Sequence, residues 1–335
     1  MATVLYAVSR ENTFIDLDRE ALAERYELIE YYQHGVLPRP LELWRKLRRC
    51  DVVYGWFATW HTLATLALAA LLRKPSVLVV GGFDTANEPE IGYGAGQDRL
   101  RGPVARWTAR RATRLVTNSH YLVGEIEHTL GIPPDCVAVV HHGLPDRFFS
   151  VDVSAPREAL VLTVGIVYTT NLLRKGHRAF VAAACELPEA EFVLVGRWQG
   201  DAIETLRAEA PANVTFSGYL SDAELDALFR RAAVYAQPSL HEGFGLSLAE
   251  AMLAGAVPVV TPAGALPEVV GDVGVTIADQ SPEAVAAGIR EALELGRPEG
   301  ARARERVLEH FTFEARRDGI CSEVDAALRT RDNGG

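Results

Sequence analysis

The stretch PSLHEGFGLSLAEAMLAGAVPVVTPAGALPEVVG, from Pro238 to Gly271, is the most informative part of this chain. It places Glu242 just before an expected helix and Glu250 inside that helix, with the turn Gly243–Leu246 between them. The first N–H groups of a helix have no partner within the helix and carry a partial positive charge, so they suit an anion such as a diphosphate. The two carboxylates can accept bonds from hydroxyls on either side of it. This arrangement predicts a nucleotide sugar as the ligand.

The expected burial of this helix favours that interpretation over a simpler one. Two glutamates that flank a helix start usually form a solvated cap. Here the helix is expected to continue as LSLAEAMLAGAVPVVTP, which is apolar on nearly every side and therefore belongs between a sheet and another layer. Because an unpaired buried carboxylate is costly, Glu250 needs a partner. We interpret the region as a ligand site.

The same stretch closely resembles the E-x7-E region of the family-four retaining glycosyltransferases, which have the GT-B fold. The match includes the run Gly264–Val270, and the resemblance is strong from about Leu160 to Phe313 and weak before that. The resemblance implies that Glu242 contacts the donor sugar and that Glu250 holds the ribose hydroxyls. It also implies that the backbone at Phe244, Gly245 and Leu246 binds the diphosphate and the sugar.

Short apolar runs alternate with helical patterns throughout, which is typical of βαβ units with a parallel sheet. We expect an α/β protein of the GT-B type, with two doubly wound Rossmann-like domains facing across an interdomain cleft. Residues 1–150 would form the acceptor-side domain, 151–312 the nucleotide-sugar domain, and 313–335 a helix packing back on the first domain. The expected strands are Val4–Val8, Leu28–Tyr32, Val52–Trp56, Val77–Gly81, Leu115–Asn118, Val137–His141, Leu160–Gly165, Phe192–Gly196, Val214–Gly218, Val234–Gln237, Ala256–Thr261 and Gly274–Ile277.

Cations follow the first strand of the second domain. Arg174-Lys175-Gly176 is expected at a helix start, where two positive charges can neutralise a diphosphate. A solvated basic turn is the alternative, but the resemblance places Lys175 on the donor phosphate. The family's usual arginine, directly after the glycine equivalent to Gly165, is replaced by Ile166. We expect Arg174 to supply the missing guanidinium.

Two further turns are expected to border the nucleotide. Gly218 and Tyr219 would form a wall of the base pocket, and Arg197 would border the same pocket, although a structural turn is an equal alternative at both places. The identity of the base does not follow from these residues.

The first domain departs from the family pattern. Ser9–Asn12 replaces a glycine-rich loop, and Phe83-Asp84 stands where the family often has His-Asp. We expect Asp84 to face the acceptor, with a turn-forming role as the alternative. The only D-x-D sequence, Asp16–Asp18, lies away from the expected site and is not taken as a metal motif.

Charge and cysteine content narrow the function class. The net charge is −10; residues 1–150 hold 17 basic and 17 acidic residues, so the remainder holds 34 − 17 = 17 basic and 44 − 17 = 27 acidic. An acidic second half argues against nucleic-acid binding. The cysteines are too scattered for a metal site and are expected to be reduced thiols in a cytoplasmic protein: Cys50, Cys136, Cys185 and Cys321.

Two basic amphipathic segments, Arg39–Arg49 and Arg99–Arg114, can lie on an anionic membrane, which would make the protein peripheral at the inner membrane face. Ordinary surface helices are the favoured alternative. The oligomeric state does not follow from the sequence.

Together these features predict a retaining, metal-independent glycosyltransferase that uses no cofactor. It would move a sugar from a nucleoside-diphosphate sugar to a hydroxyl of a glycan, glycolipid or small molecule. The proposed catalytic residues are Glu242, Lys175, Arg174 and Asp84. The alternatives are a non-catalytic nucleotide-sugar-binding protein and a glycoside hydrolase that uses Glu242 and Glu250.

Overall fold

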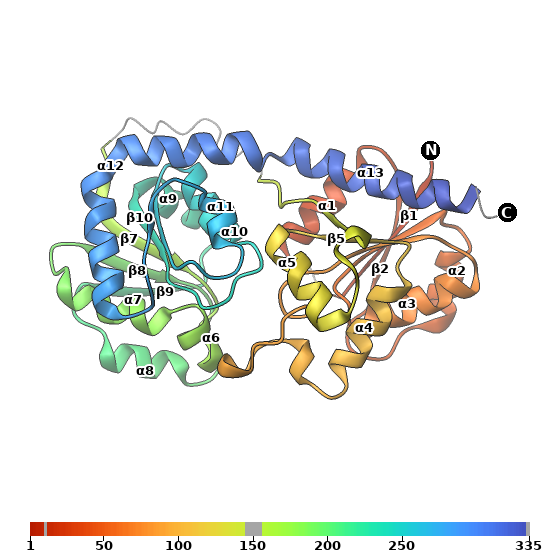
Figure 1. Cartoon of the computed structure of the whole chain (residues 1–335), viewed down its shortest axis with the longest axis horizontal. Coiled ribbons are helices and arrows are strands. Elements are labelled where there is room, and N and C mark those ends of the chain that lie inside the picture. The colour runs from red at the N-terminus through yellow and green to blue at the C-terminus, as the bar shows by residue number, and fades with distance from the viewer. Residues whose placement is uncertain (10–11, 145–155, 333–335) are drawn as a thin grey trace. The chain divides into compact units, whose positions relative to one another are not determined.

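The computed structural model describes residues 1–9, 12–144 and 156–332, which fall into two compact units (Figure 1). The first unit combines Met1–Gly143 with Thr312–Gly335, and the second is Leu144–Phe311. The boundary expected near residue 150 lies outside the described residues. Among those described, no helix has the length and apolar character that crossing a bilayer requires.

The first unit is a parallel six-stranded sheet with helices on both faces. The strand order is β2-β1-β3-β4-β5-β6. Its strands are β1 Thr3–Val8, β2 Glu27–Tyr32, β3 Val52–Trp56, β4 Ser76–Val79, β5 Arg114–Thr117 and β6 Val137–Val139. Its helices are α1 Thr13–Ala23, α2 Pro40–Leu47, α3 Trp60–Leu71, α4 Arg101–Arg111, α5 His120–Glu125 and α13 Phe313–Asp332, with short turns η1 Pro89–Ile91, η2 Ala95–Gln97, η3 Ile126–Leu130 and η4 Pro134–Cys136. Side chains alternate along β1, so that Leu5 joins the core under α2, α3 and α4 while Tyr6 joins the core under α1 and α13.

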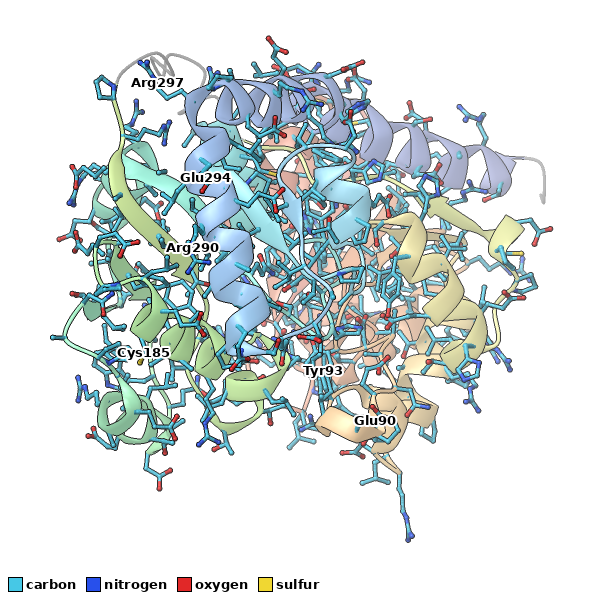
Figure 2. The ribbon with its side chains drawn as sticks, turned by 60° about the vertical axis from the view of Figure 1, so that its left-hand side comes forward. Glu90, Tyr93, Cys185, Arg290, Glu294 and Arg297 are labelled. Carbon is cyan, nitrogen blue, oxygen red and sulfur yellow. The ribbon has the colours of Figure 1, made fainter. Side chains whose placement is uncertain are left out.

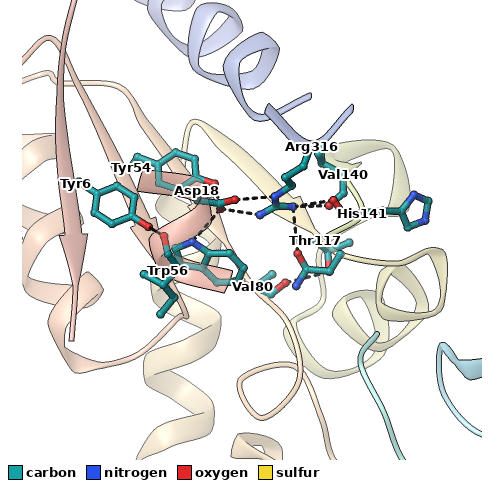
Figure 3. Close-up of polar contacts among 11 residues, drawn as sticks. Tyr6, Asp18, Tyr54, Trp56, Val80, Thr117, Val140, His141 and Arg316 are labelled. Carbon is teal, nitrogen blue, oxygen red and sulfur yellow. Dashed lines mark hydrogen bonds and ion pairs between the residues drawn. The ribbon is translucent and has the colours of Figure 1, made fainter. Parts of the chain in front are cut away.

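A buried ion pair ties α13 to α1 within this unit (Figure 3). The Arg316 guanidinium donates from Nε to Asp18 Oδ1 at 2.8 Å and from Nη2 to Asp18 Oδ2 at 2.7 Å. The Tyr54 hydroxyl and the Trp56 indole N–H also donate to Asp18 Oδ2, at 2.6 and 3.0 Å. The second acid of the D-x-D sequence is therefore a buried structural partner of the C-terminal helix.

The second unit repeats the architecture with a strand order of β12-β11-β10-β7-β8-β9, again all parallel. Its strands are β7 Glu158–Val164, β8 Glu191–Val195, β9 Val214–Gly218, β10 Ala232–Gln237, β11 Val257–Val260 and β12 Val275–Thr276. Its helices are α6 Thr169–Arg174, α7 His177–Ala183, α8 Ala202–Glu209, α9 Asp222–Arg231, α10 Leu246–Leu253, α11 Leu266–Val270 and α12 Pro282–His310, with the turn η6 Ala184–Glu186. One face of the sheet is covered by α9, α10 and α11, and the other by α7 and α8.

Helix α12 serves both faces because it bends. Gly296 has φ 58° and ψ −149°, which interrupts the helix just before Pro298. Figure 2 shows Arg290 and Glu294 on the segment before the bend and Arg297 beyond it. The segment before the bend contributes Ile289 to the core under α7 and α8, whereas the segment after it contributes Val307 to the opposite core.

The α/β class with two doubly wound Rossmann-like domains is confirmed, and each of the twelve expected runs overlaps a strand. One local expectation is wrong. The helix that carries Glu250 ends at Leu253, and the apolar residues Val257–Val260 form β11 in place of further helix. Gly255, with φ 92°, turns the chain between them, and the following valines favour a strand.

Candidate active site

The second unit carries most of the predicted site residues at the carboxyl ends of its strands, where open α/β sheets bind ligands. Strand β10 ends at Gln237, and the loop that follows leads through Glu242 to α10. Gly264 holds this loop against the next one: a Cβ there would lie 2.2 Å from the Glu242 carbonyl oxygen. The Ala265 N–H donates to that same oxygen at 2.9 Å. The backbone of Glu242 is therefore fixed from two sides.

The Glu242 side chain forms an ion pair with Lys175. Glu242 Oε2 accepts from Lys175 Nζ at 2.6 Å and from Gln237 Nε2 at 2.8 Å. The two charged side chains are 15% and 19% exposed. Burial alone would raise the pKa of Glu242, but the charges of Lys175 and Arg174 hold it below its ordinary value. Glu242 is thus an ionised, oriented carboxylate near neutral pH.

The sequence predicts that Lys175 and Gly176 lie at the start of a helix. In the structure they lie between two short helices. Lys175 caps the end of α6, and Gly176 precedes α7. Gly176 has φ 69°, and a Cβ there would meet the Pro238 carbonyl oxygen at 2.2 Å. Only glycine allows this left-handed turn and this close approach, which brings Lys175 to the loop that carries Glu242.

Arg174 braces that loop. Its side chain is 7% exposed, Nε donates to Asn171 Oδ1 at 3.0 Å, and Nη1 donates to the His241 carbonyl oxygen at 3.3 Å. Asn171 in turn donates to the Ile166 carbonyl oxygen at 2.6 Å. The Arg174 charge therefore lies close to Glu242, while its described hydrogen bonds are made within the protein.

The predicted diphosphate turn leads into α10. Gly243 and Phe244 form the loop, Gly245 caps the helix with φ 97°, and Leu246 is its first residue. Glu250 lies in the second turn of α10 and is 5% exposed.

The sequence analysis did not select Tyr235, on β10, because its position in an apolar run is typical of a core aromatic residue. Its hydroxyl accepts from the Val164 N–H at 3.3 Å. Burial raises the pKa of this hydroxyl, and the charges of Glu242 and Glu250 raise it further. Tyr235 is therefore a neutral hydroxyl beside both acids.

His177, the first residue of α7, was also missed. It is 1% exposed, and neither ring nitrogen has a hydrogen-bond partner among the described residues. Burial, with the charges of Lys175 and Arg174, lowers its pKa to about 3. A Cβ at Gly165 would lie 2.9 Å from His177 Nε2, so Gly165 makes room for this neutral ring.

An aromatic rim follows β8 and β9. The Arg197 guanidinium lies 4.1 Å over the Tyr219 ring, and Tyr219 is 64% exposed. Trp198, which the sequence analysis did not select, packs against Gly218, where a Cβ would meet its ring at 3.0 Å. The available signal in the sequence was its position, because Trp198 lies two residues after Gly196, which ends an expected strand.

Asp84 belongs to the first unit, in the loop after β4. It is 1% exposed, Oδ2 accepts from the Ala58 N–H at 2.8 Å, and Oδ1 accepts from the Gly81 N–H at 3.0 Å. Burial raises its pKa to about 6, against the lowering effect of these two bonds. Such contacts are those of a turn-forming aspartate.

The basic segments form α2 and α4, with Trp44 and Trp107 36% and 37% exposed. The Arg111 guanidinium stacks 4.9 Å from the Trp107 ring. Of the four free cysteines, Cys50 and Cys321 are buried, and the other two are exposed.

Two family descriptions match this chain in succession. Glycosyltransferase Family 4 matches residues 16–148, and Glycosyl transferases group 1 matches residues 159–295. The MMP alpha-(1->4)-mannosyltransferase of Mycolicibacterium hassiacum is 34% identical over 50% of this chain and 41% of its own length. The D-inositol 3-phosphate glycosyltransferase of Mycobacterium bovis is 30% identical over 66% of this chain and 47% of its own length. The chain thus spans less than half the length of these curated relatives.

Solved structures share the fold over nearly the whole chain. HepE of Anabaena, determined in complex with UDP and glucose, has a TM-score of 0.81 at 15% identity and covers 97% of this chain and 100% of its own. Sucrose-phosphate synthase of Thermosynechococcus elongatus has a TM-score of 0.76 at 17% identity and covers 98% and 100%. At such identities the likeness is one of fold, and the fold is GT-B. With both halves matched by their own family descriptions, the chain belongs to the family-four, group 1 glycosyltransferases.

Proposed function

We propose that the protein transfers a sugar from a nucleoside-diphosphate sugar to an acceptor hydroxyl, with retention of anomeric configuration and without a metal ion. The observation that carries the proposal is the ion pair of Lys175 and Glu242 beside the start of α10. A cation and a helix N-terminus suit a diphosphate, and an ionised carboxylate suits sugar hydroxyls. The relatives named as mannosyltransferase and inositol phosphate glycosyltransferase support the same class.

In this proposal the diphosphate competes with Glu242 for Lys175. Before the donor binds, the Lys175 ammonium is held 2.6 Å from the carboxylate. A diphosphate at the start of α10 would draw the ammonium toward itself, which would release Glu242 Oε2 to accept from sugar hydroxyls. Glu250, one helical turn further on, would accept from the ribose hydroxyls. Arg197 and Tyr219 would border the base.

The chemical step breaks the bond between the anomeric carbon and the phosphate oxygen. The acceptor oxygen then bonds to the same face of that carbon, and the acceptor proton passes to the departing phosphate. Negative charge grows on the phosphate in the transition state, so Lys175, Arg174 and the α10 start would stabilise it by about 3–4 kcal/mol each. These protein charges would take the place of a metal ion.

Turnover of UDP-, GDP- and ADP-sugars, with and without EDTA, tests the proposal. At 100 times its dissociation constant, the accepted donor should stabilise the protein by about 2.7 kcal/mol. Product should form equally with EDTA and retain the donor's anomeric configuration by NMR. An inverted product would contradict retention, and loss of product with EDTA would contradict metal independence. Stabilisation by a donor with no product from any hydroxyl acceptor would favour a non-catalytic binding protein.

A further inference from the structure

A cavity of about 190 Å³ lies in the first unit, beside the carboxyl ends of β3 and β4. This is the edge of the sheet at which open α/β domains bind ligands. The cavity is lined by Ala58, Thr59 and Trp60 after β3, by Phe83 after β4, and by Ala95, Arg101 and Val104 from η2 and α4. All of these described residues belong to the first unit.

Apolar side chains dominate the cavity. Of the lining residues, Ala58 and Ala95 are buried and Phe83 is 37% exposed. The Phe83 ring makes an edge-on contact with the Tyr93 ring at 5.5 Å between centroids, and Figure 2 labels Tyr93 and Glu90. An engineered apolar cavity of about 150 Å³ binds benzene, so this one fits a group of that size or slightly larger. A whole drug-sized ligand needs about 300 Å³ or more, so only part of an acceptor fits.

Among the described residues of the lining, only Arg101 is charged. Its guanidinium lies 5.6 Å from the centre of the Phe83 ring. Its described carboxylate contact is Asp98, at 3.6 Å, and both side chains are about half exposed. Such exposed pairs are weak, so an anionic ligand can displace this one. Arg101 therefore brings a positive charge to a cavity whose other described lining residues are mostly apolar.

Asp84 joins two loops that line the cavity. Its Oδ2 accepts from the N–H of Ala58, and the residue before it is Phe83; both of these residues belong to the lining. The buried carboxylate thus ties the loop after β3 to the loop after β4. This gives Asp84 a positioning role next to the cavity.

We propose that this cavity binds a ring-sized apolar group of an anionic acceptor, with Arg101 contacting the anionic group. The inference rests on the proposed function and on the expectation from the sequence that the first unit takes the acceptor. It adds the acceptor's chemical class: an apolar substituent of about the size of a benzene ring next to a phosphate or carboxylate.

Phenyl phosphate is a suitable probe, measured by calorimetry with the donor site saturated by a nucleoside diphosphate. Burial of its ring should make it bind at least about tenfold tighter than inorganic phosphate. Val104→Trp, which fills the cavity, should remove this advantage and leave inorganic phosphate binding unchanged. Arg101→Gln should weaken both ligands. Arg111→Gln is the control on the same helix, because Arg111 lies outside the lining, and it should weaken neither.

The inference would be overturned if phenyl phosphate bound no tighter than inorganic phosphate. It would also be overturned if a Val104→Trp protein with a normal melting temperature still bound phenyl phosphate more tightly than inorganic phosphate. If that variant fails to fold, Ala95→Leu, which fills the same cavity from η2, is measured in the same way and replaces it in the test. Binding to anionic vesicles that Arg101→Gln abolishes, without phenyl phosphate binding, would assign the arginine to a membrane surface and contradict the inference. Failure of the proposed function is a separate result, in which the wild type binds no nucleoside diphosphate.

Discussion

Replacing Lys175 by methionine separates the stabilising role of the Lys175–Glu242 pair from its proposed catalytic role. Breaking a fully buried pair costs about 3–5 kcal/mol, because the remaining charge is left uncompensated. Here the side chains are 19% and 15% exposed, so we expect a smaller loss of about 2 kcal/mol. For a unit of this size that lowers the melting temperature by about 4–8 °C. Turnover should fall about 10²- to 10³-fold if Lys175 faces the departing phosphate as proposed, because that cation is lost.

A second substitution makes the test decisive. In the double variant Lys175→Met, Glu242→Gln neither charge of the pair remains, and Arg174 keeps its bonds to Asn171 and to the His241 carbonyl oxygen, so the melting temperature should recover part of the loss. Turnover should stay as low as in the single variant or fall further. The assays are thermal melting and product formation from the accepted nucleotide sugar. Recovery of turnover together with stability, or wild-type turnover in Lys175→Met, would refute the reasoning.

Three further predictions concern single sites. Gly176→Ala should lower the melting temperature and weaken donor binding at least tenfold. The control Gly200→Ala shares φ 69° but has open space around it, so it should show only the small cost of the backbone conformation in melting. Equal effects of the two variants on donor binding would contradict the close-approach argument. The folded-state pKa of Asp84 is raised to about 6, so ionisation of this carboxyl lowers the free energy of unfolding by up to about 3 kcal/mol as pH rises from about 4 to 6. Asp84→Asn should lose this slope in melting curves recorded against pH. An unchanged slope would contradict the prediction. Arg316→Gln should cost about 3–5 kcal/mol in thermal melting, since the side chains of its pair are 2% and 1% exposed. Arg317→Gln should cost much less, because its partner Glu24 is half exposed. Similar losses in the two variants would contradict a buried anchor.

The fold was predictable because its strands are continuous apolar runs and its turns carry glycines at fixed places. The apolar runs predicted the strands, including the one within Ala256–Thr261. The expectation that the helix of Glu250 continues through the same residues was wrong, because LAGAVPVV is apolar as a helix or as a strand and the turn at Gly255 ends the helix. Glu242 and Lys175 were each selected from motifs that lie far apart in the sequence, but the ion pair between them was not predicted. Their predicted roles toward a donor stay predictions.

Other parts of the site could not be read from the sequence because they depend on long-range packing. Gly165 leaves room for the buried His177 ring, which has no hydrogen-bond partner among the described residues, and no local sequence pattern reports that close approach. The contact of Arg316 with Asp18 joins residues at opposite ends of the chain. These two contacts exist only in the folded chain, and the types of the residues that make them do not predict them.

The structure of this protein bound to whichever of UDP, GDP or ADP stabilises it most tests the central claim most directly. The account predicts diphosphate oxygens within hydrogen-bond distance of the backbone N–H groups at Gly245 and Leu246 and of Lys175 Nζ, with the bond from Lys175 to Glu242 broken. A nucleotide bound elsewhere, with that ion pair intact and the start of α10 unoccupied, would contradict it.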